Sequence, residues 1–367
     1  MVDSEGKRGD VDGDAGASAS RAAAEPTAAE PTAAAVPPTN AAGSLDESTL
    51  FETPLVELDL GIEPTVYAKA EWFNFYTTGT PGTVKSRIGY AMIDAAQRRG
   101  DLDPDQPIIE PSSGNTGAAV ARVGTARGYD VTIASPEDAG AGKREVIREA
   151  GAELTTVPAA APYDAIIEAV ERAAAENDYY WPNQYMNPDN PGIHEATTGA
   201  EIREQAPELT HYVTGAGTGG TITGVARALG DEVTIVGYEP ASDPSEIEGT
   251  RYLRTGNHPY QDVYEQFRVD EKRYLTTDTA MKAARWLRLQ YADREIPIRD
   301  TGQWDRDQVR AGLRVDGEFV VGPSTGANVA LVYGLAHEGF LARDDVVVTT
   351  LCDRGDRYSE GLWSDLF

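Results

Sequence analysis

From Leu50 onward, short apolar runs alternate with stretches whose apolar residues recur every three or four positions. The short runs predict strands, because a strand buried on both faces is apolar throughout. The longer stretches predict amphipathic helices, and the one at 84–99 places Val84, Ile88 and Met92 on one face. The predicted strands are 65–70, 107–110, 130–135, 153–157, 211–214, 233–238, 319–321 and 346–351, and the predicted helices include 84–99, 143–150, 163–177 and 222–229.

Alternation of strands and helices at this spacing predicts crossover connections and hence mainly parallel sheets. We therefore expect an α/β fold. In such sheets, ligands bind at the loops that leave the carboxyl ends of the strands, so these loops are where functional residues are expected.

Residues 1–48 follow neither pattern. They are rich in Ala, Pro, Asp and Glu, repeat the sequence AEPTA at 24–28 and 29–33, and contain almost no apolar side chain larger than alanine. Burial of so little apolar surface cannot offset the entropy lost on ordering. We expect a disordered acidic tail that acts mainly as a solvating extension, with partner binding as the alternative.

The charge excludes two classes of partner. Lys and Arg total 32 and Asp and Glu total 60, which gives a net charge of −28. A surface this acidic repels nucleic acid and anionic membranes. Only six of the basic residues are lysine, and acid-rich, lysine-poor chains suit concentrated salt, where screening is strong. We interpret the chain as halophilic, or simply as acidic and soluble, which dialysis into low salt would distinguish.

Cysteine and histidine give no sign of a metal site. The chain has one cysteine, Cys352, and four scattered histidines, which excludes a disulfide framework and any zinc site that needs two thiolates. We predict no metal, and we expect Cys352 to be a buried structural thiol. Neither an apolar segment of membrane length nor a signal peptide is evident, so a cytoplasmic location is expected.

A lysine stands where a helix is predicted to begin. In Thr80-Pro-Gly-Thr-Val-Lys-Ser-Arg87, Lys85 lies in the first turn after a Pro-Gly turn. A cation there opposes the helix dipole, which suits an amine that works uncharged as a nucleophile. An ordinary exposed lysine is the alternative, and the residues alone leave both open.

Three polar loops each follow a predicted strand and begin a predicted helix. They are 111–117 (PSSGNTG), 215–221 (GAGTGGT) and 321–327 (VGPSTGA). Glycines and hydroxyls at a helix N-terminus form an anion-binding nest. The second loop has no Walker lysine and matches the dinucleotide pattern only in part, so a monophosphate suits it better. A capped turn is the alternative for each loop taken alone.

In this order and spacing, the lysine loop, SSGNTG, GTGGT and PSTGA resemble the pyridoxal-phosphate enzymes of the cysteine synthase (O-acetylserine sulfhydrylase) family, of the tryptophan synthase β-like fold type. The resemblance runs from about Thr53 to Tyr358 and includes the stretch HEATTGAEI at 194–202. It implies two three-layer domains with mainly parallel twisted sheets and the active site in the cleft between them. The implied boundaries are 49–85 plus 190–367 for a large domain that binds the cofactor phosphate, and 86–189 for a small mobile domain that carries the substrate loop.

The resemblance also implies a role for each matching residue. Lys85 would be the catalytic lysine that carries pyridoxal 5'-phosphate, Asn115 would bind the cofactor ring oxygen, and Ser324 would face the ring nitrogen. The cofactor phosphate would be bound by Gly217, Thr218, Gly219, Gly220 and Thr221. The substrate carboxylate would be bound by Ser112, Ser113, Thr116 and Gln184.

The implied reaction is β-replacement, which makes L-cysteine from O-acetyl-L-serine or O-phospho-L-serine and sulfide through an aminoacrylate intermediate. Cystathionine or diaminopropionate synthesis and serine/threonine dehydration are alternatives at the same site, and a cofactor-free binding protein is an alternative of another class. Arg251 or Arg254 could bind a phosphate leaving group, although surface ion pairing is the simpler interpretation. Relatives are commonly homodimers, so a homodimer is expected.

Three departures from the family pattern stand out. Ser86 replaces the usual acidic residue after the lysine, and Ser112 replaces a usual threonine. An extra stretch around 291–314 precedes PSTGA. The first two substitutions are chemically mild, and the third lengthens the segment before PSTGA.

Overall fold

The computed structural model describes residues 45–76, 81–112, 114–137, 139, 141–158, 163–243, 245–253, 261–358 and 363–364, without the side chains of 141–143 and 163. The chain divides into two compact units, Met1–Ala41 and Ala42–Phe367, and all described residues belong to the second. The predicted tail therefore lies almost wholly outside the described residues, as do Ser113 and Arg254.

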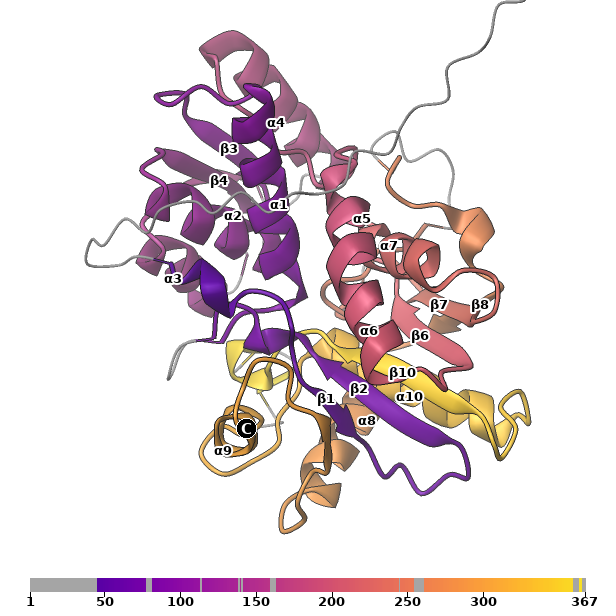
Figure 1. Cartoon of the computed structure of the whole chain (residues 1–367). Helices are drawn as coiled ribbons and strands as arrows, with labels where there is room; N and C mark the ends of the chain where they lie inside the picture. The colour runs from indigo at the N-terminus through magenta and orange to yellow at the C-terminus, as the bar shows by residue number, and fades with distance from the viewer. Residues whose placement is uncertain are drawn as a thin grey trace, which may run out of the picture. The chain divides into compact units, whose positions relative to one another are not determined.

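The larger of two sheets has seven strands in the order β8-β7-β6-β10-β2-β1-β9 (Figure 1). Neighbouring strands are parallel except where β1 pairs with β2 and with β9. The strands are β1 (Leu55–Glu57), β2 (Thr65–Ala70), β6 (His211–Gly215), β7 (Thr234–Pro240), β8 (Glu271–Leu275), β9 (Ile298–Asp300) and β10 (Val346–Leu351). This arrangement confirms the predicted α/β fold with a mainly parallel sheet.

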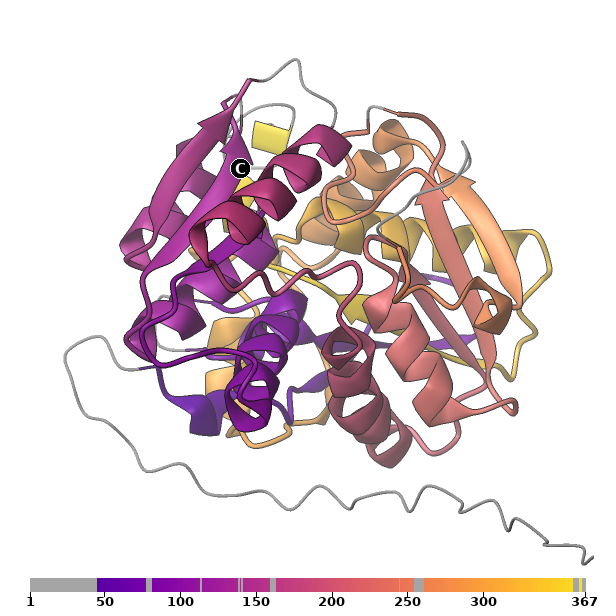
Figure 2. The same ribbon diagram turned by 90° about the horizontal axis from the view of Figure 1, so that it is seen from above.

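The smaller sheet has three parallel strands in the order β3-β4-β5, which are β3 (Ile108–Pro111), β4 (Val131–Pro136) and β5 (Glu153–Val157). Seen from above, these strands and their helices lie beside the larger sheet (Figure 2). All three strands come from within 86–189, while strands of the larger sheet come from both sides of that range. The division into two domains at these boundaries stays a prediction.

Helices connect the strands and cover the sheets. They are α1 (Val84–Arg99), α2 (Asn115–Ala126), α3 (Ala141–Glu149), α4 (Tyr163–Asn177), α5 (Asp189–Ile193), α6 (Ala200–Gln205), α7 (Gly220–Leu229), α8 (Thr277–Gln290), α9 (Arg306–Gly312) and α10 (Pro323–His337), and a π-helical segment, η3 (His194–Gly199), joins α5 to α6. The short 3-10 segments are η1 (Glu47–Thr49), η2 (Glu71–Phe73), η4 (Gln266–Arg268) and η5 (Gly355–Tyr358). In the described part of the chain, no helix has the length and apolarity that crossing a bilayer requires.

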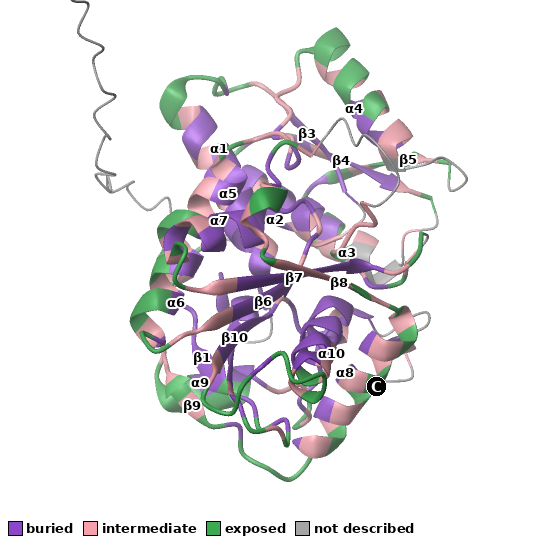
Figure 3. Ribbon diagram, turned by 90° about the vertical axis from the view of Figure 1, so that its right-hand side faces the viewer, coloured by how far each residue is buried: buried purple, intermediate pink, exposed green. Residues whose placement is uncertain are grey.

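Buried apolar residues lie between the sheets and their helices (Figure 3). One cluster joins the larger sheet to α8 and α10 through residues such as Val213, Leu287 and Val332. Another joins the smaller sheet to α1 and α2 through Ile88, Ile108 and Val120. Packing on both faces keeps the loops at the carboxyl ends of the strands in place.

One predicted strand is wrong. Residues 319–321 form only an isolated bridge between Val321 and Arg354, and no ladder. Phe319 is nevertheless fully buried, so its apolar run marks core rather than strand. The extra stretch near 291–314 supplies β9, which pairs with β1 at the edge of the larger sheet, and then α9.

Candidate active site

Lys85 lies in the first turn of α1, as predicted. The Thr83 hydroxyl caps this helix by accepting the Lys85 N–H at 3.1 Å, and the Ser86 hydroxyl accepts the Thr83 N–H at 3.1 Å. Ser86, which departs from the family pattern, therefore closes a reciprocal capping box. The cap fixes the backbone on either side of Lys85.

The Lys85 amine has no hydrogen bond or ion pair with any described residue, whereas Lys69, Lys272 and Lys282 are all paired with carboxylates. Lys85 keeps some accessible surface, but burial of its amine lowers its pKa, an effect that nearby Cys352 and Asp353 oppose. An unpaired, desolvated lysine of this kind is a candidate nucleophile or base.

The three helices that begin at the predicted loops share one feature, a glycine at the N-cap. These residues are Gly114 before α2, Gly219 before α7 and Gly322 before α10. Helices α1, α8 and α9 instead have Thr83, Thr276 and Asp305, whose side chains accept helix N–H groups. A glycine N-cap has no side chain that could occupy this place, so an anion or polar ligand can approach the helix end.

The loop before α7 is shaped by close packing. Gly219 has a φ of 88°, and a Cβ there would lie 2.3 Å from the Tyr264 Cβ. A Cβ on Gly217 would lie 2.2 Å from the Gly249 carbonyl oxygen. The glycines therefore allow both the left-handed backbone and the close approach of neighbouring segments. With a helix dipole behind it, this loop fits a phosphate.

The loop before α2 lies against the segment that carries Gln184. The Ser112 hydroxyl accepts the Gly117 N–H at 2.9 Å, and the Thr116 hydroxyl donates to the Gln184 side-chain oxygen at 2.8 Å. Ser112, Thr116 and Gln184 are all buried. The structure thus brings these three predicted substrate-binding residues together, and Ser113 lies outside the described residues.

Asn115 connects this loop to the end of β10. Its side-chain NH2 donates to Asp353 Oδ2 at 2.6 Å, and its oxygen accepts from Arg357 at 3.4 Å. The same Asp353 accepts from the Tyr358 hydroxyl, and Asp353 contributes to the field at Lys85. Asn115 and Lys85 therefore both face the carboxyl end of β10.

Ser324 lies at the start of α10, near the loop before α7. A Cβ on Gly249 would lie 3.7 Å from the Ser324 hydroxyl, and Gly249 also packs against Gly217. Beside Ser324, burial raises the pKa of the Cys352 thiol to about 12. Cys352 as a whole residue is of intermediate exposure, but its thiol is desolvated, which agrees with the expected buried thiol and makes it unreactive at neutral pH.

Asn190, which the sequence did not predict as a site residue, connects the segment that carries Gln184 to the loop before α7. Its side-chain NH2 donates to the Gln184 carbonyl at 2.7 Å and to the Thr218 hydroxyl at 3.1 Å. Polar contacts therefore run from Thr116 through Gln184 and Asn190 to Thr218. The arrangement offers an amine with no hydrogen bond or ion pair to a described residue, a glycine-capped helix N-terminus that suits a phosphate, and a polar loop that suits a carboxylate. Pyridoxal phosphate with an amino-acid substrate requires these three features.

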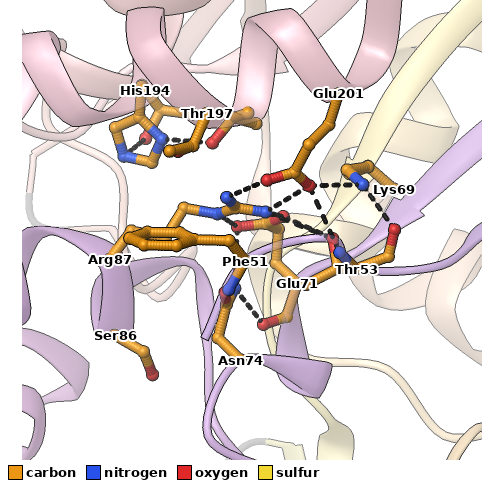
Figure 4. A network of polar contacts seen from close by, with 12 residues as sticks. Phe51, Thr53, Lys69, Glu71, Asn74, Ser86, Arg87, His194, Thr197 and Glu201 are labelled. Atoms are coloured by element: carbon orange, nitrogen blue, oxygen red, sulfur yellow. Dashed lines mark hydrogen bonds and ion pairs between the residues drawn. The ribbon is translucent and has the colours of Figure 1, made fainter. Parts of the chain in front are cut away.

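A buried ion network surrounds Arg87, two residues after Lys85 in the chain (Figure 4). Arg87 pairs with Glu71 at 2.7 Å and with Glu201 at 2.5 Å, and Lys69 pairs with Glu201 at 2.7 Å. Lys69, Glu71 and Arg87 have no accessible surface. Burial alone would raise the pKa of Glu201, but Arg87 and Lys69 hold that pKa well below its usual range. The network joins α1, two residues beyond Lys85, to β2, η2 and α6.

This network is hard to predict from the sequence. Its members are spread from Lys69 to Glu201, and only Lys69 breaks a local rule, because it interrupts the otherwise largely apolar β2. A charge in a buried strand signals a buried partner. The partner itself is not identifiable from sequence spacing.

Comparison with known proteins agrees with the geometry. Residues 47–353 match the family model described as "Pyridoxal-phosphate dependent enzyme". Cysteine synthase B of Escherichia coli (strain K12) is 32% identical over 329 residues, which cover 87% of this chain and 96% of that protein. Cysteine synthase of Staphylococcus aureus (strain Mu50 / ATCC 700699) is 31% identical over 314 residues, with coverage of 83% and 92%.

Solved structures of similar fold have several activities. O-ureido-L-serine synthase superposes with a TM-score of 0.72 at 27% identity and covers 89% of this chain and 96% of its own. A hydrogen sulfide-producing enzyme from Fusobacterium nucleatum superposes with a TM-score of 0.69 at 26% identity, with coverage of 87% and 100%. The fold and family are thus shared by proteins with different named products.

Proposed function

Because the chain belongs to the pyridoxal-phosphate-dependent cysteine synthase family, whose chemistry is β-replacement, we propose that it makes L-cysteine from O-acetyl-L-serine and sulfide. The observation that carries this proposal is the unpaired, desolvated Lys85 amine beside three helices with glycine N-caps. When bound, the cofactor supplies an electron sink that acidifies the substrate α-carbon.

We assign the proton transfers to Lys85. Burial lowers its pKa, which increases the fraction of neutral amine available near neutral pH. The neutral Nζ can accept the proton released at the substrate α-carbon and return it after the nucleophile has added at the β-carbon. The capping box of Thr83 and Ser86 fixes the backbone that positions Lys85 in the site.

We assign carboxylate binding to the loop before α2. The Thr116 hydroxyl donates to the Gln184 oxygen, which directs the Gln184 NH2 group away from Thr116. That NH2 lies 3.4 Å from the Pro111 carbonyl, a long contact that a substrate carboxylate could replace. The helix N-terminus at Gly114 adds a favourable field for the anion.

Ser324 and Asn115 would hold the cofactor ring. The Ser324 carbonyl accepts from the buried Tyr238 hydroxyl at 3.1 Å, which anchors the start of α10. A neutral hydroxyl at the ring nitrogen does not keep that nitrogen protonated as a carboxylate would, and the weaker electron sink favours β-elimination and replacement. Asn115, restrained by Asp353 and Arg357, would bind the ring oxygen.

Substitution of Arg251 tests whether the leaving group of the serine substrate is acetate or phosphate. This residue pairs with Asp164 and lies over the Tyr185 ring at 5.1 Å, so it is already engaged. We expect Arg251→Ala to lower kcat/KM for O-acetylserine and O-phosphoserine by the same factor, below about five-fold, as loss of a partly exposed ion pair would. Steady-state kinetics with both donors measure this. A loss confined to O-phosphoserine would assign phosphate binding to Arg251 and make O-phosphoserine the substrate.

Product analysis distinguishes the proposal from the other activities of the fold. With O-acetylserine and sulfide, wild-type protein is expected to release L-cysteine and acetate. Consumption of homocysteine or another nucleophile, or release of ammonia and keto acid without a nucleophile, would instead indicate a related synthase or a dehydratase. The expected homodimer stays a prediction by resemblance.

A further inference from the structure

Glu110 is a fully buried carboxylate near the end of strand β3, just before the loop that leads into α2. It lies in β3, next to Pro111, with 0% of its surface exposed. No ion pair joins it to a cation among the residues that the structure describes. Its two oxygens instead accept backbone N–H groups, from Asn183 at 3.0 Å and from Gln184 at 3.4 Å.

These two N–H groups belong to the turn that presents Gln184. Asn183 adopts a φ of 53°, a left-handed conformation that asparagine tolerates better than most residues. From this turn the Gln184 side chain contacts Thr116, and the Gln184 carbonyl accepts from Asn190. Glu110 therefore holds a segment whose contacts run from the loop before α2 to Asn190, which in turn contacts the loop before α7.

The environment of Glu110 disfavours its charge. Burial raises its pKa to about 8, and the hydrogen bonds from Gln184 and Asn183 limit that rise. Its register partner on β4 is the apolar Ile133, and the core of α1 and α2 on this face is formed by Ile88, Val120 and others. Tyr180 is a titratable group close enough to interact electrostatically with Glu110. The pKa of Tyr180 is raised mainly by burial and in small part by Glu110.

A buried carboxylate with this environment lowers stability as the pH rises. Its pKa in the folded protein is higher than in the unfolded chain, so the folded state binds more protons between about pH 4.5 and 8. Stability therefore falls through that window. A neutral glutamine of the same size would avoid the loss, so stability alone does not explain why the chain has an acid here.

We propose that Glu110 is a positioning residue for the amino-acid substrate, because its carboxylate fixes the Asn183–Gln184 turn so that the Gln184 side chain stays at the carboxylate-binding loop. This inference rests on the proposed function of that loop. It predicts that loss of the carboxylate weakens substrate binding without slowing the chemical step, as loss of a ground-state contact does.

The test is Glu110→Gln in the holoenzyme. Glutamine has nearly the same size as glutamate but only one acceptor oxygen. Its NH2 group would therefore face one of the two backbone N–H groups as a second donor. At pH 9, above the Glu110 pKa of about 8, the carboxylate is charged. We expect KM for the amino-acid donor and the dissociation constant of L-cysteine, measured there by intrinsic tryptophan fluorescence, to rise about tenfold, as for one hydrogen bond to a charged group. We expect kcat and the KM for sulfide to change less than about twofold, and the Tm at pH 9 to be equal or higher.

Asp270→Asn is the control, because Asp270 also accepts a strand N–H, from Ile235 at 2.8 Å, but beside β8 at an edge of the larger sheet, whereas Glu110 lies in the smaller sheet. It should bind substrate like the wild type. Unchanged L-cysteine affinity in Glu110→Gln, or a lower Tm together with equal losses of kcat and affinity, would overturn the proposal. If Glu110→Gln does not fold, the shorter Glu110→Asp must show the same rise in KM. Wild-type protein that binds L-cysteine but makes none would refute the proposed function instead.

Discussion

Replacing Lys85 by alanine is expected to lower kcat by about 10³-fold or more. The substitution removes the group to which we assign both the covalent attachment of the cofactor and the two proton transfers. The Lys85 amine makes no hydrogen bond or ion pair with a described residue, so we expect the fold not to depend on it. The variant should therefore keep its secondary structure by circular dichroism and its Tm within a few degrees.

The cofactor itself should still bind to Lys85→Ala, because the loop before α7 and Ser324 are untouched. Equilibrium dialysis with pyridoxal phosphate measures this binding. Lys282→Ala is the control, since Lys282 is an exposed residue paired with Asp278 at 2.6 Å on α8, and its loss should leave kcat unchanged. Substantial turnover by Lys85→Ala would transfer the catalytic role to another group.

Replacing Glu201 by alanine is expected to destabilise the protein by about 3–5 kcal/mol, the usual effect of leaving a buried charge unpaired. Glu201 is the shared partner of Arg87 and Lys69, both of which have no accessible surface. Its removal leaves two cations near each other with only Glu71 to balance them. Urea denaturation monitored by circular dichroism measures the change in free energy of unfolding.

Glu208→Ala is the matched surface control, because Glu208 pairs with Arg299 at 3.0 Å where both side chains are exposed. Its effect should stay below about 1 kcal/mol. The sign of the pH dependence follows from the depressed pKa of Glu201. Its contribution is present above the unfolded-state pKa and is lost as the pH falls toward the folded-state value. Equal destabilisation by the two substitutions would contradict a structural role for the network.

The central strands were predictable because their apolar runs are continuous. Predicted boundaries agree with the central strands β2 and β10, with α1 and α4, and also with β5, a partly exposed strand at the edge of the smaller sheet. The edge strands β8 and β9 and their neighbour β1, which lies next to β9, were missed, since they are only three to five residues long and carry charged residues. The strand predicted at Phe319–Val321 was wrong for the opposite reason, because a short apolar run can be buried without pairing in a sheet.

The candidate site was predictable where its chemistry is local in sequence. Lys85, the glycine loop and the Ser112 loop each stand at a strand–helix junction. Asn190 and Asp353 could not be found in this way, because their importance comes from contacts between loops that are distant in sequence. Glu110 left a signal, an acid in the apolar run PIIE, but only the structure shows which N–H groups it holds.

Borohydride reduction of the cofactor-loaded protein, followed by peptide mass mapping, tests the central claim most directly. Of the six lysines in the chain, Lys85 alone should carry the mass of the reduced cofactor, and the peptide that contains it should be modified in proportion to the pyridoxal phosphate bound. Modification of a different lysine, or a protein that binds the cofactor and yields no modified peptide, would contradict the account.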